Sequence, residues 1–191
     1  MKRNFLNLLL FAAAGAAFTS CDEHIANESA VQSSASNYFE LDGTSKNAAA
    51  GIFQFDTTPE KSSEAGTSYY RHELGFLTNA FSFGYDETEG LILSGEGSSV
   101  WMELNSKTSD LEPGTYTFTG TQEGAAPFDF GYGAAELDGN NYTFNSGTVT
   151  VSRTDKVYTI QFEGQASMAG SKGSIPVKGF YSGNLKAFED K

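Results

Sequence analysis

Reactive side chains are scarce in this sequence. It has one cysteine, Cys21, and two histidines, His24 and His72. Because His24 lies in the expected N-terminal tether, His72 is the only histidine of the expected domain. A Ser-His-Asp site could therefore be built only on His72, and a metal site of several histidines cannot be built at all. His72 shares one face of an expected strand with Tyr70 and Leu74. We therefore expect a hydrogen-bonded structural histidine near the edge of the core, and neither a metal ion nor a cofactor.

Carboxylates are the one plentiful reactive group, with 24 Asp and Glu side chains. Three of them fall within Asp86–Gly90, but without the spacing of a calcium loop, so a solvated acidic turn is the better interpretation. Asp138–Asn141 is likewise interpreted as a turn first and a cation site second. Glycoside hydrolysis needs two carboxylates about 5–9.5 Å apart. Since no pair is singled out by spacing, we expect no catalytic residue and no enzyme.

The best lead toward binding is Trp101. Val100, Met102 and Leu104 form the apolar face of an expected strand, which places Trp101 and Glu103 on the opposite face. Such an aromatic ring can stack on a sugar while a nearby carboxylate binds its hydroxyl groups. Tyr69 also falls opposite the apolar face of its own strand, so Trp101, Glu103 and Tyr69 are candidate ligand-binding residues. The alternative is that both strand faces are covered and Trp101 fills a second core or a barrel end.

One candidate modification site lies in a loop. Asp56-Thr57-Thr58 resembles the acceptor motif for O-glycosylation in exported proteins of Bacteroidota, with Thr57 as the acceptor. The surrounding segment is rich in Pro, Glu and Ser, so a glycan would be sterically allowed there. The motif is short.

The N-terminus carries a secretion signal. Lys2 and Arg3 precede the apolar run 5–18, and small residues lead into Cys21. A lone cysteine at this place resembles the lipobox of bacterial lipoproteins, in which residues 1–20 are removed and Cys21 is lipidated. Lipidation would leave no thiol for disulfides, metal binding or catalysis, and multiple acyl chains suffice for a stable membrane anchor. The alternative is an ordinary signal peptide with an incidental cysteine.

Residues 21–36 are expected to form a flexible tether. They are rich in Ala and Ser, and a chain of this length spans roughly 20 Å on average. Asp22 and Glu23 resemble the acidic export signal of surface-displayed lipoproteins of Bacteroidota. We expect an outer-membrane lipoprotein exposed on the cell surface, with a periplasm-facing tether as the alternative.

The remaining chain is acidic and long enough for one domain. Without Lys2 and Arg3, the 12 basic side chains become 10 against 24 acidic ones, a net charge of −14. Such a surface repels phosphate backbones, which excludes nucleic acid as a partner. Residues 37–191 are expected to form a single domain with a sizeable core.

Alternation of apolar and polar residues predicts an all-β domain. It is clearest at 148–152 and 157–163, which flank Arg153–Lys156 as a tight hairpin turn. Further strands are expected at 37–41, 48–55, 69–78, 91–95, 98–105, around Tyr116 and Phe118, and at 179–185. Successive short strands indicate an antiparallel meander, forming either a lipocalin-like barrel or a flattened β-sandwich.

Four segments together resemble a group of small lipoproteins of Bacteroidota without known activity. They are residues 111–118, 146–152, 157–162 and 179–185. The resemblance implies a lipocalin-like or calycin-like β-barrel and carries no catalytic residue. The expected function is that of a non-catalytic binding or accessory module for a glycan or small apolar ligand. The alternative is a structural or protein-interaction lipoprotein of the outer membrane, without a small-molecule ligand.

Overall fold

The computed structural model describes residues 36–61, 66–86, 90–120 and 125–189, and it is all-β there. Its strands are β1 (Tyr38–Leu41), β2 (Thr44–Asn47), β3 (Ala50–Phe55), β4 (Glu60–Lys61), β5 (Ser68–Leu77), β6 (Ser82–Asp86), β7 (Gly90–Ser94), β8 (Ser99–Ser106), β9 (Gly114–Phe118), β10 (Asp129–Leu137), β11 (Asn140–Thr154), β12 (Val157–Met168), β13 (Ile175–Gly183) and β14 (Lys186–Glu189). Within these ranges, no helix has the length and apolarity needed to cross a membrane.

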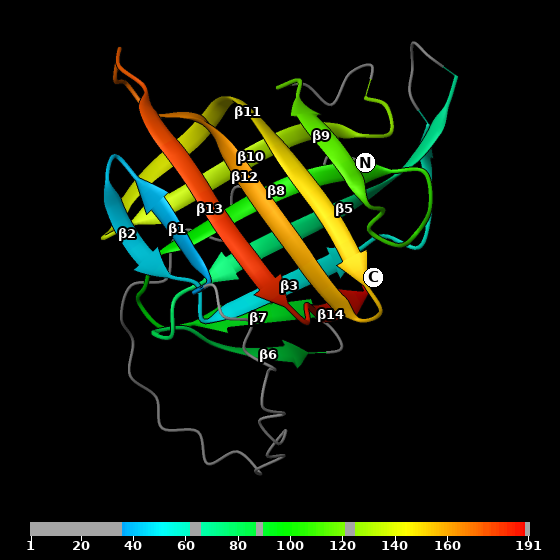
Figure 1. Ribbon diagram of the computed structural model, residues 1–191, viewed down its shortest axis with the longest axis horizontal. Helices are drawn as coiled ribbons and strands as arrows, with labels where there is room; N and C mark the ends of the chain where they lie inside the picture. The colour runs from blue at the N-terminus through cyan, green and yellow to red at the C-terminus, as the bar shows by residue number, and fades with distance from the viewer. Residues whose placement is uncertain (1–35, 62–65, 87–89, 121–124, 190–191) are drawn as a thin grey trace.

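One large sheet dominates the fold and curls back on itself. Its strand order is β14-β3-β5-β8-β10-β9-β11-β12-β13-β1-β2, with β4 paired to β5. Figure 1 shows β11, β12 and β13 in front of β3, β5, β8 and β10, which they cross at an angle. The prediction of an all-β barrel or sandwich is therefore confirmed. Most pairings are antiparallel, but β9 pairs with β10 and β14 with β3 in parallel.

The two halves of the sheet meet through packed aromatic side chains. Phe76 of β5 stacks on Phe162 of β12, with ring centroids 5.6 Å apart, and contacts Tyr181 of β13 at 5.2 Å. Phe76 is 1 % exposed, and Phe39 and Tyr116 are fully buried. Close packing of this kind fills the middle of the fold with side chains from both halves.

The hairpin turns follow from their residue types. Asp155 adopts a left-handed φ of 55° between Thr154 and Val157, which pair with each other, so the predicted turn is confirmed. Asp138 (φ 50°) and Gly139 (φ 81°) make the equivalent two-residue turn between β10 and β11. Asp and Gly tolerate positive φ in such turns better than most residues do.

Five strands fall outside the expected segments: β2, β4, β6, β10 and β14. The β2 sequence is wholly polar, and β10 is rich in Gly and Ala, so neither has a strong pattern of its own. β6 and β7 form a separate two-stranded sheet. Phe83 of this small sheet contacts Phe188 of β14 edge-on, with centroids 6.4 Å apart.

Candidate functional site

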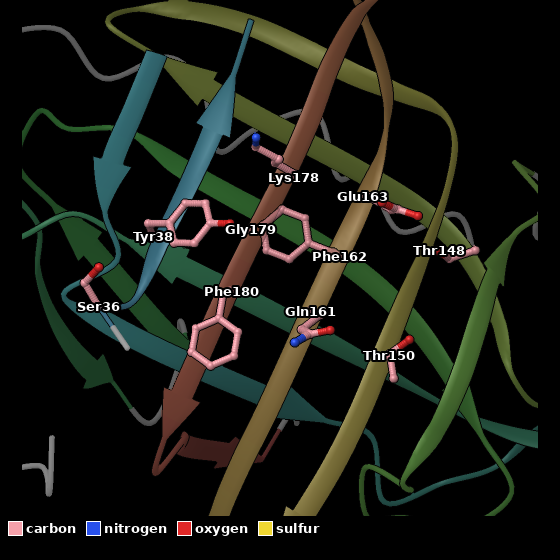
Figure 2. A pocket seen from close by; sticks show the side chains of 10 residues that line it. All are labelled: Ser36, Tyr38, Thr148, Thr150, Gln161, Phe162, Glu163, Lys178, Gly179 and Phe180. Carbon is pink, nitrogen blue, oxygen red and sulfur yellow. The ribbon is translucent and has the colours of Figure 1, made fainter. Parts of the chain in front are cut away.

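A groove of about 730 Å³ lies on the outer face of β11, β12, β13 and β1. Figure 2 shows the side chains that line it, contributed by all four strands. Except for Phe162, whose ring is part of the core, and Gly179, which has no side chain, the lining residues point outward because successive residues of a strand face opposite sides. In β13, for example, Val177, Gly179 and Tyr181 are buried, whereas Lys178 is exposed and Phe180 half-buried between them.

Cross-strand register arranges the groove in two rows. In the first row Tyr38 lies opposite Phe180, which lies opposite Gln161, and Gln161 lies opposite Thr150. The row therefore runs from two aromatic rings to an amide and a hydroxyl group. Tyr38 and Phe180 are half-buried, whereas Gln161 and Thr150 are exposed.

The second row is charged. Glu40 lies opposite Lys178, Lys178 opposite Glu163, and Glu163 opposite Thr148. Lys178 Nζ is 3.1 Å from Glu40 Oε1, and this hydrogen bond and the carboxylate charge raise the pKa of Lys178. Lys178 thus stays protonated and lies between two carboxylates at the edge of the aromatic pair.

Gly179 forms part of the groove floor. The ring of Phe162 occupies the space that a side chain at this position would need, since a Cβ atom there would lie 2.3 Å from Phe162 Cζ. The absence of a side chain therefore lets β13 lie close against the core beneath the groove.

Chemically, this arrangement suits binding. Aromatic rings pack against apolar ligand surface, and amide, hydroxyl and charged groups bind polar atoms. Among the residues that the structure describes, no three of His, Cys, Asp and Glu are grouped so that they could hold a metal ion.

The three predicted ligand-binding residues lie on the opposite half of the sheet. Tyr69 of β5 and Trp101 and Glu103 of β8 share the outer face there, as the alternation predicts. Tyr69 and Glu103 are only 4 % and 5 % exposed, and Trp101 is half-buried. The Trp101 ring covers Gly75 on the neighbouring strand, where a Cβ would lie 2.5 Å from Trp101 Cζ3.

Tyr69 belongs to a polar cluster rather than to an open platform. Its hydroxyl donates a hydrogen bond to Glu60 Oε2 at 3.0 Å, and Arg71 forms an ion pair with the other oxygen of the same carboxylate. Burial, together with this acceptor, raises the pKa of Tyr69 to about 12. Ligand binding by these residues stays a prediction, and their burial favours the alternative in which both strand faces are covered.

His72 is a core residue, as interpreted, although it is fully buried rather than near the edge. Its Nε2 lies 3.2 Å from the carbonyl oxygen of Thr108, and its ring contacts Phe53 at 5.1 Å. Nδ1 has no hydrogen-bond partner among the described residues. Burial lowers the pKa of His72 to about 4, so the ring is neutral near pH 7.

Of the two predicted modification sites, Thr57 lies among the described residues and Cys21 does not. Thr57 is exposed in the connection between β3 and β4, and the neighbouring Asp56 lies 3.8 Å from Arg71. Cys21 and nearly all of the tether lie outside the described residues, as do positions 87–89 of the acidic turn. Lipidation at Cys21 and glycosylation at Thr57 stay predictions.

Sequence reasoning missed the aromatic pair of the groove. Tyr38 and Phe180 are far apart in the chain, and only strand pairing places them side by side. The one indication in the sequence was the alternation along this strand, which places Phe180 on the face opposite Val177 and Tyr181.

Known proteins supply no assignment for the groove. No protein-family model, no curated protein and no solved structure matches this chain.

Proposed function

We propose that this protein is a lipid-anchored envelope lipoprotein whose domain binds a glycan, without catalysis, in the groove of β11, β12, β13 and β1. The observation that carries the proposal is the row in which Tyr38 and Phe180 adjoin Gln161 and Thr150. Sugar rings present apolar C–H faces bordered by hydroxyl groups. An aromatic pair beside an amide and a hydroxyl complements both.

The shape of the site favours a glycan over a small apolar ligand. An apolar ligand gains most from an enclosed apolar cavity. Here the groove is open along the sheet, and its second row is charged at Lys178 and Glu163, with Glu40 paired to Lys178 beside it. The middle of the fold, where a lipocalin-like barrel would hold apolar cargo, contains packed rings such as Phe76 and Phe162.

The expected location of the protein, anchored in a membrane by lipid, fits such a role. With lipid on Cys21 and a tether through Ser36, the groove would stand roughly 20 Å from the membrane. β1 follows the tether directly. We therefore propose an outer-membrane lipoprotein exposed on the cell surface, in keeping with the resemblance to small lipoproteins of Bacteroidota.

The test uses the chain from residue 21 onward with Cys21→Ser, applied to an array of neutral and uronic-acid-containing oligosaccharides. Any oligosaccharide bound is then titrated by calorimetry. Phe180→Ala should weaken binding about tenfold, equivalent to about 1.4 kcal/mol, because the stacked ring is lost. Gln161→Ala should weaken it too, without disturbing a core contact, because Gln161 is exposed.

Tyr132→Ala is the matched control, since Tyr132 is an aromatic residue of β10, 40 % exposed and outside the groove. It should leave binding unchanged. Equal loss in the Tyr132 and Phe180 variants would contradict the assigned site. An array without any bound glycan would favour the structural or protein-interaction role instead.

A further inference from the structure

A second cavity, of about 520 Å³, opens at the end of the fold where the β11–β12 hairpin faces β3 and β14. Its apolar walls are Phe53 and Phe55 of β3, Leu185 before β14 and Tyr158 of β12. Phe53 and Phe55 stack with centroids 5.6 Å apart, and Phe53 and Tyr158 are 5 % and 7 % exposed. Figure 1 shows β14 near the lower ends of β11 and β12. The volume falls within the range of small-molecule sites.

The one carboxylate among the residues lining this cavity is already engaged. Asp110 accepts hydrogen bonds from Arg153 through Oδ2, from the Tyr158 hydroxyl at 3.1 Å and from the Leu111 amide at 3.0 Å. Partial burial raises the pKa of Asp110, but the hydrogen bonds from Arg153 and Tyr158 outweigh this and lower it overall. Asp110 is therefore an anion whose oxygens are occupied by groups of the protein itself.

Two side chains at the rim that can still donate hydrogen bonds, Arg153 and Lys156, are cationic. Arg153 donates from Nε to the Asp155 carbonyl at 2.8 Å and from Nη1 to Asp110, and its guanidinium stacks over the Tyr158 ring at 4.9 Å. A guanidinium has five N–H groups, so donors remain. Lys156 is exposed and makes no ion pair with any residue that the structure describes.

The geometry points to a second ligand site, for a small monocarboxylate with an aromatic or short aliphatic body. The apolar body would lie against Phe53, Phe55 and Leu185, and the carboxylate would bind Lys156 and the free N–H groups of Arg153. In a chain with a net charge of −14 after residue 20, two of the ten basic side chains meet at this apolar opening. An anionic ligand needs positive charge at its binding site. Most of this acidic surface lacks such charge, whereas this opening supplies it.

The probe is 4-phenylbutyrate, and its uncharged match is 4-phenylbutan-1-ol. Both are titrated into the isotope-labelled chain from residue 21 with Cys21→Ser, and backbone amide shifts are followed by NMR. We expect saturable shifts at Leu185 and Ala187, with a Kd of about 1 mM or tighter for the carboxylate and weaker binding of the alcohol.

Lys156→Gln should weaken carboxylate binding about three- to tenfold and leave alcohol binding unchanged, because only a charge contact is lost. Ala187→Trp should abolish both, since Ala187 is exposed and lines the cavity. Lys172→Gln is the matched control for a surface lysine elsewhere. Phe180→Ala should bind the probe normally, which separates this site from the glycan groove.

Three results would overturn the site: equal affinity for the carboxylate and the alcohol, unchanged binding in both the Lys156 and Ala187 variants, or no shifts up to about 5 mM of probe. None of them bears on glycan binding.

Discussion

Phe76→Ala tests the central feature of this fold, the contact between the two halves of the sheet. Phe76 is 1 % exposed and contacts Phe162 at 5.6 Å and Tyr181 at 5.2 Å. Removing a buried Phe side chain costs about 3–5 kcal/mol through lost transfer energy and the cavity left behind. The two aromatic contacts that Phe76 loses place this substitution in the upper part of that range. The expected loss in unfolding free energy is therefore at least about 4 kcal/mol, a large fraction of the stability of a typical domain.

The assay is equilibrium unfolding in urea, followed by circular dichroism. With a slope of about 2 kcal/mol per molar urea, the midpoint should fall by about 2 M or more. Tyr132→Ala, at a side chain 40 % exposed, should change the unfolding free energy by about 0.5 kcal/mol or less. A loss below about 1 kcal/mol for Phe76→Ala would refute the packed interior, and would reopen the possibility of apolar cargo inside the barrel.

Two further predictions concern single positions. His72 has a pKa of about 4 when folded and 6.5 when unfolded, so the unfolded state binds more protons between these values and stability falls as the pH drops from 6.5 toward 4, by roughly 3 kcal/mol. Denaturant titrations at several pH values should show that His72→Leu loses this part of the slope; an unchanged slope would mean that the histidine is not held neutral. Gly179→Ala should cost about 1–3 kcal/mol, because its Cβ would meet the Phe162 ring, whereas Gly84→Ala, with nothing within 4 Å, should be nearly neutral in thermal unfolding; equal effects would contradict the close contact.

Several features could be predicted because they depend on residues close together in the chain. The alternation through Val149, Val151, Tyr158 and Ile160 defines a hairpin, since period-2 patterning and a two-residue turn are local properties. The outward phase of Trp101 was predictable for the same reason. Strands such as β10 and β14 were missed because pairing with neighbours, and not their own pattern, keeps them extended.

At the candidate site, the sequence pattern predicted which face of a strand a side chain lies on, but not its exposure to solvent. An outward phase alone does not show whether a side chain reaches solvent. Tyr69 and Glu103 lie on the outer face as expected, yet they are buried there. Phe180 has the same kind of phase, but its strand neighbours place it beside Tyr38 in an open groove.

The sequence by itself determined the fold class, the scarcity of catalytic side chains and the acidic charge, because composition and short-range periodicity are enough for these. Only the tertiary structure decided that side chains fill the middle of the curled sheet and that Tyr38 meets Phe180, because both depend on the register between strands distant in the chain. Strand register is a long-range property: a shift of one residue would turn Phe180 into the core and Tyr181 toward solvent.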